Sequence, residues 1–339
     1  MPRVSEQSSC ENPKVTVHMI TYNHAKFIAQ AIESVLMQET EFSVELIIGE
    51  DCSTDGTREI VRRYACQYPK FIRPLFPDQN LGANKNSRAV REAWRGEYIA
   101  ILEGDDYWTD PRKLQKQVAL MDQNPSYSMC GTAAQQLVVS SDGQDKQIGV
   151  YPSGPAKALY SLEDVLVEYP FWTVTFVLRN GIVNFPGWYE KAKYGDVCLL
   201  ALYAEKGPVA YLNDVTATYR IHPGGIWSGG SISEKCKNCE ETFGLLNEHF
   251  AGRYSKLFRN REMRTMIYNI PQAVLKGRGQ EAKQAYWKSF RRFALYRPVA
   301  FLKLGIAVYS DKYLPTWQWL ITRIAIRTRI RRLVALFAR

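Results

Sequence analysis

The sequence predicts an α/β domain followed by a mostly helical C-terminal region. Strand-like and helix-like segments alternate through the first part of the chain, a pattern typical of a parallel sheet flanked by helices. Helical spacing of apolar residues dominates from residue 231 onward, after a glycine-rich segment at residues 224–230. We therefore expect an extended or disordered N-terminus at residues 1–13, an α/β domain at 14–230 and a helical region at 231–339.

The α/β domain is expected to begin with four strands alternating with three helices. Buried apolar runs predict strands at residues 15–20, 44–49, 71–76 and 97–102. Apolar residues at helical spacing predict helices at residues 27–37, after a cap at Thr54 or Asp55, and at 84–94. Beyond residue 126 we expect short strands and turns to about residue 220, with a helical stretch at 196–205.

Each predicted strand ends in a polar segment. These segments are residues 21–24, 50–57, 80–82 and 103–106, and two of them are acidic. Ligands of open α/β sheets bind outside the carboxyl ends of the strands. The sequence therefore places a candidate site at this edge of the sheet.

The last of these segments is strongly acidic. Glu103, Asp105 and Asp106 lie within four residues, and their carboxylates repel one another unless a cation lies between them. A hard divalent cation such as Mg²⁺ or Mn²⁺ prefers such oxygen ligands and also binds diphosphates. The alternative is a solvated acidic turn before a helix that starts near Asp110.

Four motifs occur in order along the domain. They are Thr21-Tyr22-Asn23, Glu50-Asp51-x-Ser53-Thr54-Asp55-Gly56-Thr57, Asn80-x-Gly82 with Lys85-Asn86, and Gly96-Glu97-Tyr98-Ile99 running into Glu103-Gly104-Asp105-Asp106-Tyr107-Trp108. With these motifs the chain resembles a family 2 glycosyltransferase with the GT-A fold, of the bacterial cell-surface polysaccharide type. The resemblance covers roughly residues 14–228.

The resemblance implies that a nucleotide-sugar donor binds at the sheet edge. The residues that would hold its base and ribose are Thr21, Tyr22, Asn23, Glu50 and Asp51. This sequence departs from the usual pair of aspartates by having Glu50 first, which leaves open which of the two acids reaches the base. The alternative for this segment is a helix cap and turn.

The resemblance also implies a divalent metal, Mn²⁺ or Mg²⁺, and a diphosphate site. Glu103-x-Asp105 matches the Asp-x-Asp motif of the family with Glu in place of the first Asp. The last acid of the motif meets the metal in similar enzymes, which names Asp105, with Asp106 as the neighbouring alternative. Lys85 would face the diphosphate, or it is an exposed helix residue.

Similar inverting enzymes carry a catalytic base some ninety residues past the metal motif, at the start of a helix. Asp196 fits, 91 residues after Asp105, and could take the proton of an acceptor hydroxyl. The alternatives are that Asp196 only caps the helix, or that Glu190 is the base.

Residues 219–225 resemble the segment that closes over the diphosphate in many relatives. His222 could be a third metal ligand, and Arg220 could face a phosphate. An exposed residue beside a turn is the alternative for His222.

Aromatic residues could recognise the acceptor. We expect this role in residues 169–194, and the tryptophans that could stack on sugar rings are Trp108, Trp172, Trp188 and Trp227. Burial in the core is the alternative for each of them.

The charge of the chain is concentrated at its C-terminal end. The whole sequence has a formal net charge of +10, from 44 Lys and Arg against 34 Asp and Glu. Residues 288–339 contain twelve basic side chains and one acid, Asp311, so the rest of the chain is close to neutral. Such a near-neutral body offers no surface for nucleic acid, and we expect none to bind.

This basic, aromatic tail has one apolar helical arc, formed by Ile326, Ile330, Leu333, Val334 and Phe337. We expect it to lie on an anionic membrane surface, although packing on the domain or in a homo-oligomer is an alternative. No run of about 18 uncharged apolar residues predicts a transmembrane helix. The polar start and the seven scattered cysteines are typical of a cytoplasmic protein, so we expect it on the cytoplasmic face of the membrane.

Together these features predict an inverting, metal-dependent glycosyltransferase. It would move a sugar from a nucleotide-diphosphate donor, with a UDP-sugar favoured, to a saccharide or lipid-linked saccharide acceptor in surface polysaccharide assembly. The alternative function is a nucleotide-sugar-binding protein without catalysis, in which Glu103 marks a degraded metal site.

Overall fold

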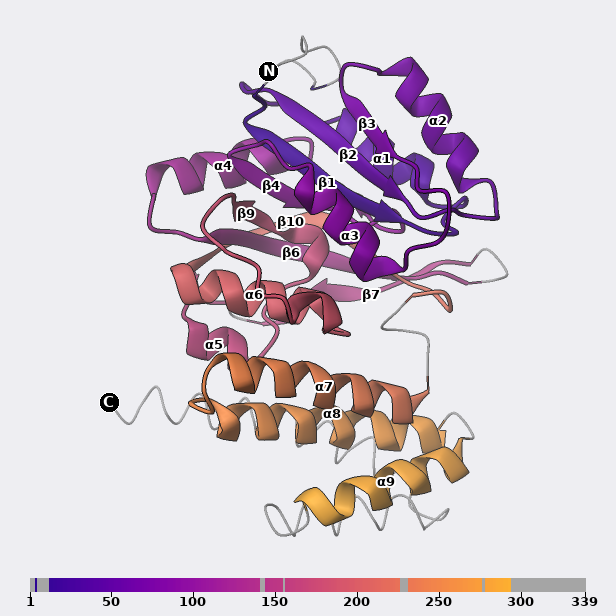
Figure 1. The fold of residues 1–339 in the computed structure, drawn as a ribbon, viewed down its shortest axis with the longest axis vertical. Coiled ribbons are helices and arrows are strands. Elements are labelled where there is room, and N and C mark those ends of the chain that lie inside the picture. The colour runs from indigo at the N-terminus through magenta and orange to yellow at the C-terminus, as the bar shows by residue number, and fades with distance from the viewer. Residues whose placement is uncertain are drawn as a thin grey trace. The chain divides into compact units, whose positions relative to one another are not determined.

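The computed structural model describes residues 4, 12–140, 144–154, 156–225, 231–275 and 278–293 (Figure 1). The chain divides into two compact units, Met1–Ser228 and Gly229–Arg339.

The first unit is built on a mixed sheet whose first four strands are parallel. In chain order these elements are β1 (Val15–Thr21), α1 (Ile28–Leu36), β2 (Val44–Glu50), α2 (Thr57–Gln67), β3 (Ile72–Leu75), α3 (Ala83–Glu92) and β4 (Tyr98–Ile101). Their spatial order is β3-β2-β1-β4. The predicted alternation of strands and helices is confirmed. All four strands therefore place their carboxyl ends at one edge.

The sheet continues beyond β4 with strands of mixed direction. The order is β9 (Val177–Arg179), β6 (Met129–Val138), β10 (Val209–Ile221) and β5 (Tyr107–Trp108), while β7 (Lys146–Tyr151) pairs with β6 and β8 (Leu159–Tyr160) with β10. The expectation of only short strands here was wrong, because β6 has 10 residues and β10 has 13. Register shifts after Leu212 and Val215 break the alternation of β10, which hides its length in the sequence.

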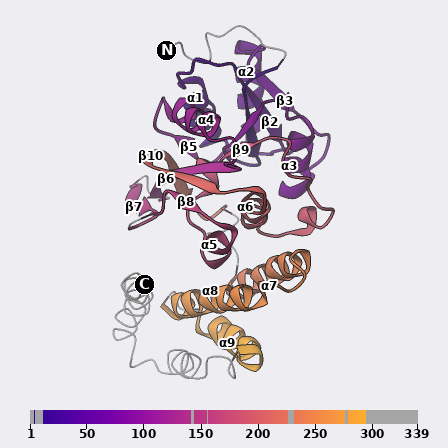
Figure 2. The same ribbon diagram turned by 90° about the vertical axis from the view of Figure 1, so that its left-hand side faces the viewer.

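Alternating side chains of the sheet enter two separate cores. Val15, Val17 and Met19 of β1 pack with α1, α2 and α4 (Lys113–Gln123) on one face. On the other face Ile99 and Ile101 of β4 pack with α5 (Leu162–Val167) and α6 (Gly195–Lys206). Figure 2 shows α1 and α4 on one side of the sheet and α3 and α6 on the other. The site edge is thus supported by two packed layers.

The start of α2 differs from the prediction. Its N-cap is Gly56, with a φ of 94°, and neither Thr54 nor Asp55 takes that position. The Asp55 carboxylate instead accepts hydrogen bonds from the Thr57 backbone N–H and hydroxyl, at 3.1 and 2.6 Å. Glycine takes the cap because this backbone conformation strains residues that have a Cβ.

The second unit contains α7 (Ile232–His249), α8 (Ser255–Leu275) and α9 (Gly279–Phe293). A capping box between Ser231 and Glu234 starts α7, and a small apolar core includes Met263, Met266 and Tyr286. Within the described residues, none of the helices has the length and apolar character needed to cross a membrane. The predicted membrane-binding helix at residues 326–337 lies outside the described residues.

Candidate active site

The loops after β1 and β2 are joined by hydrogen bonds. The Asn23 side-chain oxygen accepts from the Thr54 backbone N–H at 2.9 Å, and the Asn23 N–H donates to the Ser53 hydroxyl at 2.9 Å. Asn23 and Cys52 both have positive φ values, 56° and 58°, so the chain turns sharply at each strand end. Beside this loop Tyr22 is 44% exposed, while the buried hydroxyl oxygen of Thr21 has no hydrogen-bond partner in the described structure. The residues expected to hold the nucleotide base and ribose therefore lie on loops whose conformation is fixed by hydrogen bonds.

Glu50 and Asp51 are buried and already engaged. The Glu50 carboxylate forms an ion pair with Arg58 and accepts from the Ser53 N–H at 2.8 Å. The two oxygens of Asp51 accept from the backbone N–H groups of Leu81 and Gly82, at 2.7 and 2.9 Å. Asp51 therefore shapes the loop between β3 and α3, and Glu50 shapes the loop after β2, roles that the sequence motif did not reveal.

The acidic turn between β4 and β5 meets the end of β10. Asp105 Oδ2 lies 3.0 Å from His222 Nε2 and 3.7 Å from His24 Nε2. Despite burial, the His222 hydrogen bond and the two imidazoles hold the pKa of Asp105 below its usual value. The expected partners Asp105 and His222 are thus brought together, with His24 beside them.

Asp106 points to the backbone of β10. It is 2% exposed, and its Oδ1 accepts from the Arg220 backbone N–H at 2.7 Å. Burial and the charges of Asp105 and Glu103 raise the pKa of Asp106 well above its usual value. In this geometry Asp106 stabilises the acidic turn by joining it to the backbone of β10.

Glu103 belongs to the acidic turn and interacts electrostatically with both Asp105 and Asp196. Its Oε2 is buried and has no hydrogen-bond partner in the described structure. Burial, followed by the negative charges of Asp105 and Asp196, raises the pKa of Glu103 to about 8. Unlike Glu50 and Asp51, this carboxyl has an oxygen available to a ligand.

Arg220 is buried among the loops of the site. Its Nη1 donates to the Asp105 backbone carbonyl at 2.7 Å, and its Nη2 donates to the Gln30 side chain. The guanidinium also lies over the rings of Tyr107 and Phe27, at 4.4 and 5.0 Å from their centroids. Burial lowers the pKa of Arg220. Arg220 therefore holds the acidic turn in place through the Asp105 backbone carbonyl.

Asp196 stands in the first turn of α6, as expected, but it is not the helix cap. Tyr194 occupies the cap position and makes no side-chain cap hydrogen bond. After burial, the negative charge of Asp196 is one of the causes that raise the pKa of Glu103 and of the Tyr169 phenol. The alternative base, Glu190, is held in ion pairs by Arg88 and Arg91, at 3.1 and 3.4 Å.

Lys85 is exposed on the first turn of α3, directly after the loop that Asp51 holds. That position is compatible with a phosphate at the sheet edge. His24 is a residue that sequence reasoning missed, although it directly follows the first motif and could have been included. Tyr169 is the first residue of the segment expected to recognise the acceptor, but no local signal singled it out.

Two of the tryptophans expected to stack on sugar rings, Trp108 and Trp172, have different surroundings. Trp108 is 1% exposed and donates its indole N–H to the Val174 carbonyl at 2.9 Å, so the buried alternative is correct for it. Trp172 stacks on Tyr219 of β10, with ring centroids 4.6 Å apart and planes inclined by 2°. Trp227 lies outside the described residues.

The sequence profile described as "Glycosyl transferase family 2" matches residues 16–176. The chain carries a family 2 glycosyltransferase domain. The resemblance predicted from the four motifs is thereby confirmed, and the matched stretch contains the loops and the acidic turn described above.

Relatives of the family 2 domain extend past this stretch. Rv1520 of Mycobacterium tuberculosis is 34% identical over 223 residues, 63% of this chain and 60% of that protein. The chain thus spans 60% of the length of this relative. TuaG of Bacillus subtilis, named for glycosyl transfer in teichuronic acid biosynthesis, is 27% identical over 241 residues, 70% of this chain and 88% of that protein.

A solved structure shares the fold. The mannosyltransferase PcManGT from Pyrobaculum calidifontis, in complex with GDP-Man and Mn²⁺, superposes with a TM-score of 0.53 at 14% identity. The match covers 92% of this chain and 91% of that one. It supports the expected GT-A architecture of the family 2 domain.

The donor atoms of the family 2 domain fit a divalent cation that shares its coordination with a ligand. Within the described ranges, no group of three His, Cys, Asp or Glu side chains forms a complete metal site. The pair Asp105–His222 has the right spacing, because adjacent ligands of an octahedral ion at about 2.1 Å are about 3.0 Å apart. Mg²⁺ is normally held by one or two protein groups together with phosphates and water, so two protein donors suffice.

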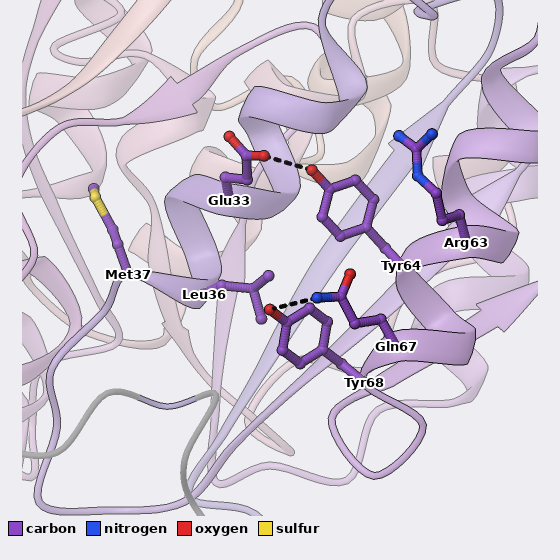
Figure 3. Close-up of a pocket in the computed structure, with 7 residues that line it drawn as sticks. All are labelled: Glu33, Leu36, Met37, Arg63, Tyr64, Gln67 and Tyr68. Atoms are coloured by element: carbon purple, nitrogen blue, oxygen red, sulfur yellow. Dashed lines mark hydrogen bonds between the residues drawn. The ribbon is translucent and has the colours of Figure 1, made fainter.

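A surface pocket of about 360 Å³ lies elsewhere in the family 2 domain, between α1 and α2 (Figure 3). Its lining residues are Glu33, Leu36, Met37, Arg63, Tyr64, Gln67 and Tyr68. They belong to the later turns of both helices, which return toward the amino ends of the strands. The pocket is therefore not part of the carboxyl-edge site.

Proposed function

We propose that this protein is an inverting glycosyltransferase that uses a nucleotide-diphosphate sugar, with a UDP-sugar as the first candidate. The acceptor is a saccharide or lipid-linked saccharide in surface polysaccharide assembly. One observation carries the proposal: burial and the charges of Asp105 and Asp196 raise the pKa of Glu103, which lies two residues before the Asp105 that contacts His222. The name of TuaG and the ligands of PcManGT support the substrate classes.

The donor side consists of the two joined loops and the acidic turn. Asn23 and the loop organised by Asp51 hold the base and ribose, and Lys85 faces the diphosphate. Asp105 and His222 are the residues that would hold the cation, with Asp106 supporting the turn. When bound, Mn²⁺ or Mg²⁺ supplies positive charge that stabilises the leaving diphosphate.

The acceptor side is organised around Asp196. Its carboxylate takes the proton of the acceptor hydroxyl while that oxygen attacks the anomeric carbon and the bond to the nucleotide diphosphate breaks. A single displacement of this kind inverts the anomeric configuration. The stacked pair of Trp172 and Tyr219 offers an aromatic surface nearby for a sugar ring.

A donor screen tests this function. The full chain is incubated with UDP-, dTDP- and GDP-sugars, with Mn²⁺, Mg²⁺ or a chelator, and free nucleotide is measured. We expect release from one nucleotide class, dependent on the cation, with NMR of the released sugar or product showing inversion. Donor binding without release from any sugar would instead favour the non-catalytic alternative.

We further propose that the basic residues of 288–339 hold the enzyme on the cytoplasmic face of an anionic membrane. The test is sedimentation with liposomes containing an anionic lipid, for the full chain and for a chain lacking residues 314–339. Binding should fall on deletion and weaken with salt, since screening shortens electrostatic attraction. Salt-independent binding would contradict the electrostatic account.

A further inference from the structure

We propose that Asn84 is a positioning residue for the proposed base: its side-chain amide holds the backbone that leads into α6, and with it Asp196. The inference rests on the proposed function, because Asp196 is the base of that reaction. Asn84 lies in the first turn of α3, next to Lys85, so it comes from the donor side of the site. It belongs to none of the four sequence motifs.

Two hydrogen bonds carry the proposal. The Nδ2 atom of Asn84 donates to the Glu190 carbonyl at 2.8 Å and to the Ala192 carbonyl at 3.0 Å. A side-chain amide has two N–H groups, so it can serve both carbonyls at once. The carbonyls belong to the 3₁₀ helix Tyr189–Lys191 and to Ala192, the residue that ends it. One side chain thus fixes a short turn that lies more than a hundred positions further along the chain.

This turn determines where α6 begins. Only Lys193 and Tyr194 separate Ala192 from Gly195, the first residue of α6. The N-cap residue Tyr194 makes no side-chain cap hydrogen bond, so the helix start is not fixed by a cap of its own. A displacement of the preceding backbone would therefore move Asp196 in the first turn of the helix.

Other residues on the same face of α3 support the turn. Arg88 and Arg91 follow Asn84 at helical spacing, and both form ion pairs with Glu190, at 3.1 and 3.4 Å. The Arg91 guanidinium also lies 5.2 Å from the centroid of the Tyr189 ring. Partly exposed ion pairs stabilise little, whereas the bonds of Asn84 reach the backbone itself. The positioning is therefore assigned to Asn84.

Helix α3 is itself fixed to the sheet. Asn86 is 2% exposed, and its amide donates to the Gly49 carbonyl of β2 at 2.8 Å. The backbone N–H of Gly82, the N-cap residue of α3, donates to the Asp51 carboxylate at 2.9 Å. Neither contact involves Asn84, so a substitution there should leave α3 in place and remove only the two bonds to the turn. A fixed helix is the kind of support that keeps a functional group in its productive position.

The test removes the two N–H donors. Asn84→Ala shortens the side chain, and Asn84→Asp keeps its shape but has oxygens that accept. A carboxylate in the first turn of a helix is stabilising, so Asn84→Asp should fold. Asn180→Ala is the matched control, because the Asn180 amide likewise donates to a backbone carbonyl, that of Gly96, at 2.8 Å. Gly96 precedes β4 and thus lies at the edge of the sheet opposite the site.

The first measurement is hydrogen exchange of the full chain without ligand, followed by mass spectrometry of peptides that cover residues 188–194. The N–H groups of Lys191 and Ala192 donate to the carbonyls of Trp188 and Tyr189, at 2.9 and 3.1 Å, and report on the turn. We expect exchange to be at least about fivefold faster in both substitutions of the donor amide, because two bonds that oppose opening are lost. The control should exchange like the wild type.

The second measurement is kcat and KM with the donor found in the screen. The value of kcat should fall at least about tenfold in Asn84→Ala and Asn84→Asp, because the base is no longer held in position. In Asn84→Ala the donor KM should stay within about a factor of two, since Asp51 still holds the donor loop.

Unchanged exchange in both Asn84 variants, or equally faster exchange in Asn180→Ala, would overturn the inference. Faster exchange with a wild-type kcat would also overturn it, because the contact would then be structural only. The exchange measurement needs no turnover, so it decides whether Asn84 holds the turn even if the wild-type chain releases no nucleotide. The absence of release would count against the proposed function alone.

Discussion

The Nε2 atom of His222 lies 3.0 Å from Oδ2 of Asp105, although the two residues are 117 positions apart. The contact joins the end of β10 to the turn after β4 and gives the sheet edge one imidazole and one carboxylate at the spacing of adjacent metal ligands.

We predict that His222→Ala and Asp105→Asn each weaken Mn²⁺ binding at least about tenfold, because each removes one of two protein donors. Isothermal titration of Mn²⁺ with the nucleotide present measures the loss. His249→Ala is the control, since that histidine lies on α7 of the second unit. Wild-type affinity in both site variants would exclude this metal site.

Asp196→Asn should lower kcat by roughly 10²- to 10⁴-fold, because an amide cannot take the acceptor proton. Nucleotide affinity should stay within a factor of two of the wild-type value. The matched carboxyl-to-amide control is Glu190→Gln, which touches Arg88 and Arg91 and should keep most of the activity. If Glu190→Gln lost as much activity as Asp196→Asn, the assignment of the base would have to be revised.

Gly131→Ala should destabilise the first unit by about 1–3 kcal/mol, because the new methyl group would overlap the buried Phe171 ring. Urea denaturation followed by fluorescence measures the change in midpoint. Gly187→Ala provides the comparison, since no atom lies within 4 Å of the position of its Cβ. Equal midpoints in the two variants would show that the Phe171 ring can move aside without a measurable loss of stability.

The buried Lys113 should make stability depend on pH. Burial lowers the pKa of Lys113 to about 7 from its usual value of 10.5, although Cys130 and Asp110 oppose the shift. Between these values the unfolded chain binds the extra proton, so the free energy of unfolding rises with pH, by up to about 1.4 kcal/mol per pH unit. Below pH 7 both states are protonated and the contribution levels off.

Lys113→Met removes this titration and retains an apolar side chain of similar length beside Trp108. The slope of unfolding free energy between pH 7 and 10 should therefore be smaller in the variant than in the wild type. Parallel slopes would mean that Lys113 titrates alike in the folded and unfolded states.

Local patterns sufficed for the first four strands of the sheet and for part of the site. The apolar runs located β1 to β4, and the acidic segment after β4 was found because strand ends are local features. Asp196 was named from the resemblance to inverting enzymes, whose base lies some ninety residues past the metal motif at the start of a helix. In contrast, the hydrogen bonds of Asp51 to Leu81 and Gly82 depend on how two loops approach each other, which no local pattern encodes. The same is true of the burial of Arg220.

The two halves of the site come from different stretches of the chain. Apart from His222, which follows β10, the proposed donor residues lie between residues 21 and 106, whereas Trp172 and Asp196 lie in a later stretch that begins after β8. Under the proposed function, substitutions confined to the later stretch can change which acceptor is preferred, while the preferred nucleotide stays the same. A chimera that exchanges residues 169–194 with those of a relative would thus combine one donor with a new acceptor.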